Sequence, residues 1–116
     1  MNWSRSASIC MALSILLGAF GAHALKTKLD PSMMEVYKTA VLYQMIHGLA
    51  LFAVAWRLSQ GVRRAGVAGW LFLSGIILFS GSLYGLSLTG FRWLGAVTPL
   101  GGLAFFAGWV TLARGD

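Results

Sequence analysis

The sequence predicts an all-α fold, a four-helix transmembrane bundle with antiparallel up-down topology. The first observation is composition: the 116 residues are 58% hydrophobic and 10% charged, whereas an ordinary soluble domain is about 25% charged. The second is that uncharged runs are long enough to cross a ~30 Å hydrocarbon core, which takes roughly 20 helical residues. The third is that these runs lack polar–apolar alternation and are too few for a closed barrel, so helices must satisfy the backbone.

The four spans are expected to form a single transmembrane domain over residues 1–116. Their predicted bounds are about 6–25, 36–56, 65–88 and 94–113. Short connections make neighbouring helices antiparallel and leave no room for a second domain. An even number of crossings places both termini on the same side.

The first span has a second interpretation. Arg5, an apolar stretch and then Ala22-His23-Ala24 resemble a signal peptide with its cleavage site. The run is long enough to span, so we predict an uncleaved first helix. Cys10, the one cysteine, allows no internal disulfide or thiolate metal cage and is expected to be a small buried hydrophobe.

The second span begins with residues that are typical of a helix N-terminus. Asp30 or Ser32 can cap the helix, Pro31 suits its first position, and Glu35 lies in the first turn. A helix from about Pro31 to about Trp56 exceeds the hydrocarbon thickness, so it tilts or protrudes.

The fourth span contains Pro99, which removes one helical hydrogen bond. Either the helix kinks there and Gly101-Gly102 take up the bend, or Thr98 caps a helix whose first residue is Pro99. We predict the kink.

Small residues predict where the helices approach closely, because membrane helices have little hydrophobic drive to associate. Three helices carry them at a spacing of four; the residues are Ser14, Gly18, Ala22, Gly81, Gly85, Ala104 and Gly108. Packing within the bundle is the simpler interpretation, and a seam between copies of the chain is the alternative.

The net charge of +6 comes from nine scattered Lys and Arg residues that flank the apolar runs. No basic face with interleaved aromatics exists, so nucleic acid is not an expected partner. The side with the termini carries Arg5, Arg57, Arg63, Arg64 and Arg114, against Lys26, Lys28, Lys38 and Arg92 on the other side. This small excess predicts cytoplasmic termini.

Neutral polar residues gather in the half of the bilayer away from the termini. They are His23, Tyr43, Gln44, His47, Tyr84 and Thr98. One interpretation is that they hydrogen-bond across helices and fix the bundle. The other is that they line a polar cavity that binds or conducts a ligand.

Catalysis, metal and cofactor binding find little support. His23 and His47 lie at different depths and have no third ligand beside them, which argues against haem and zinc. There is no Ser/His/Asp set, no paired carboxylates and no intramembrane acid for proton coupling. We therefore expect no enzyme, no cofactor and no metal site.

Four blocks of sequence carry a family resemblance. They are Gly18–Leu25, Thr39–His47, Leu78–Tyr84 with Leu88–Gly90, and Leu94–Gly95 with Thr98–Gly102. Together they resemble the YwdK-like family of small bacterial membrane proteins, a group defined by a domain of unknown function with eukaryotic transmembrane relatives. The resemblance implies a small multi-pass protein of the bacterial inner membrane and supplies no catalytic residues.

Taken together, the sequence predicts a structural or accessory membrane protein that works in the lipid bilayer as a homo-oligomer or within a larger membrane complex. The alternative is a small-molecule or ion binding and transport module that uses the polar residues.

Overall fold

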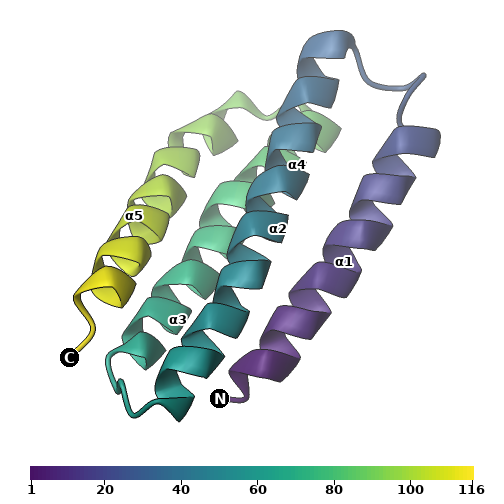
Figure 1. Ribbon diagram of the computed structural model, residues 1–116. Coiled ribbons are helices and arrows are strands. Elements are labelled where there is room, and N and C mark those ends of the chain that lie inside the picture. Colours follow the sequence, from purple (N-terminus) through teal and green to yellow (C-terminus); the bar gives the residue numbers. More distant parts are fainter.

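A computed structural model describes residues 1–116. All of its regular elements are helical and there are no strands, so the predicted all-α fold is confirmed (Figure 1). The elements are α1 (Trp3–His23), α2 (Pro31–Ser59), α3 (Ala65–Gly75), a π-helical turn (Ile76–Ser80), α4 (Gly81–Thr89), a 3₁₀ turn (Arg92–Ala96) and α5 (Thr98–Arg114). Four segments are long and apolar enough to cross a membrane: Trp3–His23, Pro31–Ser59, Ala65–Thr89 and Arg92–Arg114.

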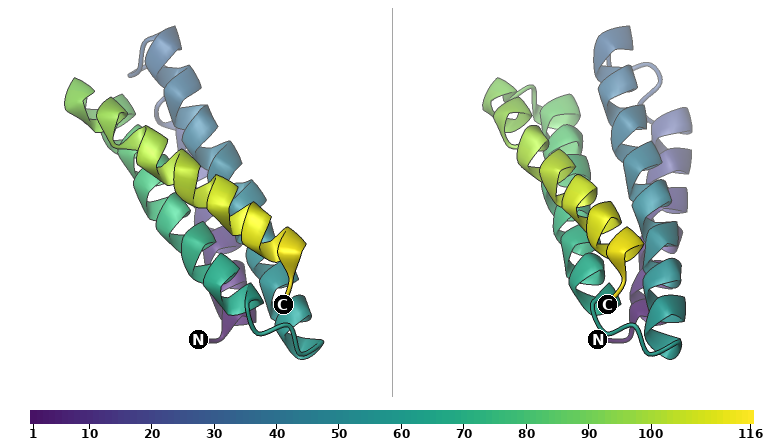
Figure 2. Two further views of the ribbon diagram at one scale, coloured as in Figure 1. Left: turned by 90° about the vertical axis from the view of Figure 1, so that its left-hand side faces the viewer. Right: turned by 60° about the vertical axis from the view of Figure 1, so that its left-hand side comes forward.

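Helix α2 lies at the centre of the arrangement. It packs against α1 on one side and against α3 and α4 on the other, and α5 packs against α3. The chain reverses direction at each connection, so both termini lie at the same end of the bundle (Figures 1 and 2). The molecule measures 48 × 26 × 18 Å, long enough in one direction to cross a bilayer.

Most of the helix ends lie beyond the bounds that were predicted for the spans. Helix α1 begins at Trp3 because the Asn2 side chain accepts the backbone N–H of Arg5 at 3.0 Å, a normal N-cap. Arg5 therefore interrupts the apolar run without interrupting the helix. At its other end α1 stops at His23, two residues before the predicted bound at Leu25.

Helix α2 begins as the sequence indicated, with Asp30 as its N-cap and Pro31 in its first turn. Asp30 Oδ1 accepts hydrogen bonds from the Ser32 hydroxyl at 2.6 Å and from the Met33 N–H at 2.9 Å. These two bonds favour the carboxylate and lower the pKa of Asp30. With 29 residues, α2 is about 44 Å long and protrudes beyond the hydrocarbon core unless it is strongly tilted.

Pro99 does not kink a continuous α-helix, so this prediction is corrected. The residues before it form the 3₁₀ turn, and α5 begins at Thr98 with Pro99 in its first turn. A first-turn N–H has no helical partner, so proline costs no hydrogen bond there. Thr98 is not the cap either: its hydroxyl lies 2.6 Å from the Ser82 hydroxyl of α4.

The glycines that bring helices together differ in part from those expected. Gly108 lies under the Phe72 ring and Gly85 under Leu94, but Gly81 faces open space and takes no part in packing inside the bundle. The closest approach to the backbone of another element is at Gly101, where an added Cβ would lie 2.3 Å from the backbone nitrogen of Phe79. Of the other predicted packing residues, Ser14 is buried, Gly18 and Ala104 are half-buried and Ala22 is exposed.

The hydrophobic core lies in the half of the bundle that carries the termini and extends to mid-height. Its buried members come from all four long segments: Trp3, Ala7, Ala50, Leu51, Val54, Ala65, Ala68, Phe72, Ile76 and Phe105. The C-terminal Asp116 closes this end, because its carboxylate accepts the backbone N–H groups of Arg63 and Arg64 at the start of α3 at 3.2 and 3.1 Å.

Candidate functional site: the polar residues of the spans

Gln44 joins three helices. Its side chain is buried in α2, where its Nε2 donates to the carbonyl of Cys10 in α1 at 3.0 Å. Its Oε1 accepts the hydroxyl of Tyr84 in α4 at 2.6 Å. An amide carries both donors and an acceptor, so this one side chain bonds to a neighbour on each side of α2.

His47, one turn further along α2, is held by two hydrogen bonds. Trp109 of α5 donates its indole N–H to His47 Nε2 at 3.0 Å, and His47 Nδ1 lies 2.9 Å from the Tyr43 carbonyl. An indole nitrogen can only donate, so Nε2 must be the acceptor. The other nitrogen then carries the proton and donates it to Tyr43. His47 is thus a neutral imidazole in the Nδ1–H tautomer.

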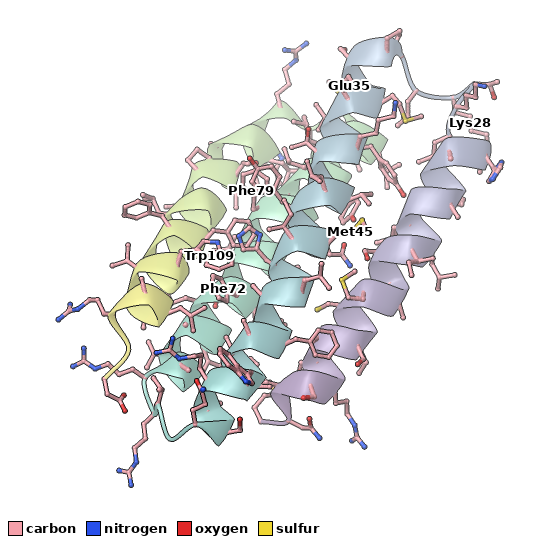
Figure 3. All side chains as sticks on the ribbon, in the orientation of Figure 1. Lys28, Glu35, Met45, Phe72, Phe79 and Trp109 are labelled. Carbon is pink, nitrogen blue, oxygen red and sulfur yellow. The ribbon has the colours of Figure 1, made fainter.

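Aromatic rings enclose the His47 imidazole. It stacks on Phe105 with a centroid distance of 3.5 Å and an interplanar angle of 7°, and Phe72 and Trp109 lie against it at 5.6 and 5.8 Å. Figure 3 shows Phe72, Phe79 and Trp109 near one another at mid-height. Both His47 nitrogens are already bonded, so this ring has no free lone pair for a metal ion or a substrate proton.

Three further polar contacts between helices were not predicted from the sequence. The Tyr37 hydroxyl donates to the Leu17 carbonyl of α1. Ser80, in the π-helical turn, donates to the Ala40 carbonyl of α2 at 2.7 Å. The Ser82–Thr98 pair joins α4 to α5. Each hydroxyl lies beside a carbonyl or hydroxyl of the neighbouring helix, a register that only the packed structure reveals.

The six predicted residues do not surround one cavity. Gln44 and Tyr84 bond to each other, His47 bonds to Trp109, and Thr98 bonds to Ser82. Tyr43 is half-buried and packs against Phe79 at 4.4 Å between ring centroids. His23 is exposed at the end of α1.

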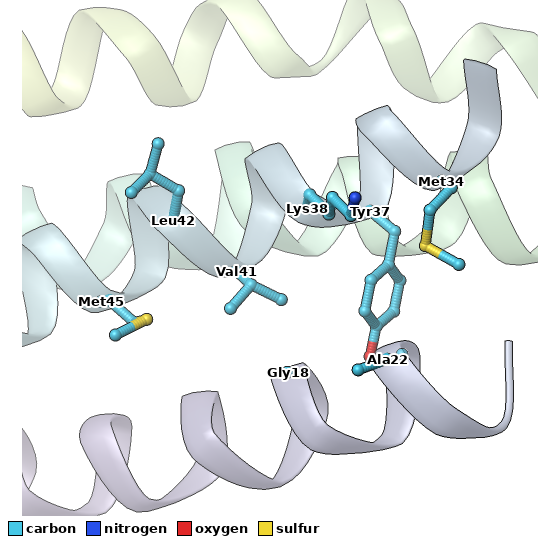
Figure 4. A pocket seen from close by; sticks show the side chains of 9 residues that line it. Gly18, Ala22, Met34, Tyr37, Lys38, Val41, Leu42 and Met45 are labelled. Atoms are coloured by element: carbon cyan, nitrogen blue, oxygen red, sulfur yellow. The ribbon is translucent and has the colours of Figure 1, made fainter. Parts of the chain in front are cut away.

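A hollow with a volume of about 210 Å³ lies elsewhere, between α1 and α2 (Figure 4). It is lined by Gly18, Gly21, Ala22, Met34, Tyr37, Lys38, Val41, Leu42 and Met45. None of the six predicted residues lines it. No three His, Cys, Asp or Glu side chains lie close enough together to hold a metal ion.

Comparison with known proteins places the chain in a family. A family model described as "Protein of unknown function (DUF423)" matches residues 17–102. The chain belongs to the DUF423 family. The match contains all four sequence blocks that suggested the YwdK-like resemblance, which is thereby confirmed.

Curated relatives of this DUF423 chain are named as membrane proteins. It is 48% identical over 105 residues to UPF0382 membrane protein SH2409 of Staphylococcus haemolyticus, covering 90% of this chain and 86% of the relative. It is 48% identical over 102 residues to UPF0382 membrane protein YwdK of Bacillus subtilis, covering 86% and 83%. No solved structure matches the chain. The relatives' names and the four apolar helices make this DUF423 protein a multi-pass membrane protein.

Proposed function

We propose that the protein is a structural or accessory membrane component, which acts by holding a defined shape in the bilayer, and that it is not an enzyme. The observation that carries this proposal is that the buried polar side chains of the spans form hydrogen bonds within the bundle. Gln44 and His47, the two largest buried polar groups, direct their hydrogen bonds to α1, α4 and α5 and to the backbone of α2 itself. Such bonds between helices stabilise membrane bundles by about 0.6 kcal/mol each, and up to about 1.7 kcal/mol.

The remaining polar atoms support the same proposal. Among buried side-chain nitrogens and oxygens, Arg57 Nε is the one without a partner, and Arg57 lies two residues from the end of α2. No carboxylate lies in the central part of a span, where a proton-coupled transporter keeps an ionisable group. These observations therefore favour a structural role of the helix bundle over catalysis or proton-coupled transport.

The proposed partners are the lipid bilayer and either further copies of the chain or a larger membrane complex. Large apolar side chains cover the outer faces of the bundle, among them Leu16, Leu103 and Phe106, exposed by 66%, 65% and 69%. A soluble protein would not leave such faces open. We propose no nucleic-acid partner.

Native mass spectrometry of the protein, extracted in mild detergent from its own membranes, tests the accessory role. We expect a discrete assembly above the 12.5 kDa chain, containing an integer number of copies or a stoichiometric second protein. Cross-linking in intact membranes before extraction controls for dissociation in detergent. A monomer in both preparations, together with solute flux through proteoliposomes of the protein alone, would contradict the proposal.

For localisation we propose the bacterial plasma (inner) membrane with both termini in the cytoplasm, on the basis of the five arginines at the terminal end. With Cys10 replaced by Ala, Lys28→Cys and Gln60→Cys report on opposite ends of the bundle. An impermeant maleimide should label position 28 in intact cells and position 60 only after permeabilisation. The reverse pattern would invert the topology.

A further inference from the structure

The hollow between α1 and α2 is an open groove with an apolar lining. Its floor on α1 consists of Gly18, Gly21 and Ala22, and its wall on α2 runs from Met34 to Met45 (Figure 4). Eleven residue steps along a helix correspond to about 16 Å. This is about half of the ~30 Å hydrocarbon core, or one leaflet of the bilayer.

The groove exists because α1 carries almost no side chain there. The Tyr37 ring packs against Gly21, where an added Cβ would lie 2.3 Å from it, and its hydroxyl bonds to the Leu17 carbonyl. This contact fixes the distance between the two helices at the upper end. One turn away, the nearest atom to an added Cβ on Gly18 is a Val41 methyl at 3.6 Å. No residue of α3, α4 or α5 lines the groove, so it faces the lipid.

The mouth of the groove is cationic. A second hollow of about 250 Å³ adjoins it, sharing Gly21, Ala22, Met34 and Lys38 and adding Lys26. The Lys38 ammonium lies 3.7 Å from the Glu35 carboxylate, with both side chains largely exposed. Exposed pairs of this kind are weak, so Lys38 remains able to turn toward an anion at the mouth.

We propose that this groove binds one anionic diacyl phospholipid, with an acyl chain between α1 and α2 and the phosphate group between Lys26 and Lys38. The apolar lining within one leaflet and the two lysines at its mouth match the two parts of such a lipid. The inference goes beyond the accessory role and does not depend on it, since neither Gln44 nor His47 lines the groove.

A helix from a second copy fits the groove less well. A helix with its side chains is about 10 Å across, whereas the groove lies between two helices that are already in contact through Tyr37 and Gly21. A single acyl chain is much thinner, and the small residues of the floor leave room for it.

Native mass spectrometry of the full-length protein, delipidated in detergent and titrated with phosphatidylglycerol or phosphatidylcholine, tests the proposal. We expect one phosphatidylglycerol adduct to saturate well before any phosphatidylcholine adduct. Ala22→Phe should fill the groove and abolish the saturable adduct. Ala12→Phe adds the same ring to an exposed position of α1 that does not line the groove, and it should bind as the unmodified protein does.

The lysines give a second readout that does not depend on the groove variant folding. Lys26→Gln and Lys38→Gln should each weaken phosphatidylglycerol binding by on the order of five-fold and leave phosphatidylcholine binding unchanged. Lys28→Gln, at an exposed position outside both hollows, is the matched charge control (Figure 3). Equal affinity for the two lipids, or full binding by Ala22→Phe, would overturn the proposal. So would an oligomer lost in Ala22→Phe with unchanged lipid binding, which would assign the groove to a second copy.

Discussion

Gly101→Ala is expected to destabilise the bundle by about 3 kcal/mol, at the upper end of the usual cost of overpacking. An added Cβ at Gly101 would lie 2.3 Å from the nitrogen and 2.7 Å from the Cα of Phe79, so the obstacle is backbone that no rotamer change can move. Helix α5 would have to separate from the π-helical turn. Reversible unfolding in mixed SDS micelles measures the loss.

Gly81→Ala and Gly102→Ala are the matched controls for this variant. Gly81 has no neighbour within 4 Å of an added Cβ, and at Gly102 the closest atom is 3.9 Å away. Alanine is the better helix former by up to about 1 kcal/mol, so both variants should be as stable as the unmodified protein or more stable. If Gly101→Ala behaves as these two do, the close approach of α5 to the π-helical turn is not present in the membrane.

Gln44→Leu is expected to lower the free energy of unfolding by about 1–3 kcal/mol. The substitution removes the bonds to Cys10 and Tyr84 and leaves the hydroxyl of the half-buried Tyr84 without its partner. An orphaned buried donor costs more than the bond itself contributed. The same unfolding titration measures the effect, and Gln60→Leu, the same substitution at an exposed position, is the matched control.

An unchanged or higher stability of Gln44→Leu would contradict a structural role for Gln44. Residues kept for ligand binding or conduction commonly reduce stability, and replacing them raises it. That outcome would favour the polar-cavity interpretation over the structural one.

The spans could be predicted from the sequence because charge is excluded from hydrocarbon regardless of tertiary detail. The start of α2 could also be predicted from the sequence, because Asp30 caps the helix and Pro31 suits its first turn whatever the helix packs against. The start of α1 was harder to predict, because the apolar run stops at Arg5 whereas the helix is capped three residues earlier by Asn2.

The π-helical turn shows where a local pattern fails. No residue of Ile76–Ser80 predicts a π-helical turn from the sequence. Because such a turn contains one extra residue, the helical residues after it are rotated by about 100° relative to a continuous α-helix. Residues grouped by α-helical spacing across such a turn lose their common face. Gly81 and Gly85 both follow the turn within α4, so it moves them together. They differ because Leu94 of the 3₁₀ turn lies against Gly85, whereas no atom lies within 4 Å of an added Cβ at Gly81.

The candidate site was predicted only in part for a different reason. Helical periodicity places Gln44 and His47 on one face, but it does not say which residues of other helices face them. Trp109 was not among the predicted site residues, yet its indole N–H is the donor that fixes the His47 tautomer. Tyr37, Ser80 and Ser82 bond to carbonyls or hydroxyls of other helices, partners that depend on the relative register of the helices.

A double-mutant cycle on Gln44 and Tyr84 tests the central claim most directly, namely that the polar side chains of the spans hold the helices together. The unmodified protein, Gln44→Leu, Tyr84→Phe and the double variant are unfolded under the same conditions, and the coupling energy isolates the one bond between α2 and α4. We predict a favourable coupling of about 0.6–1.7 kcal/mol. Additive single effects, with no coupling between the two residues, would contradict the account.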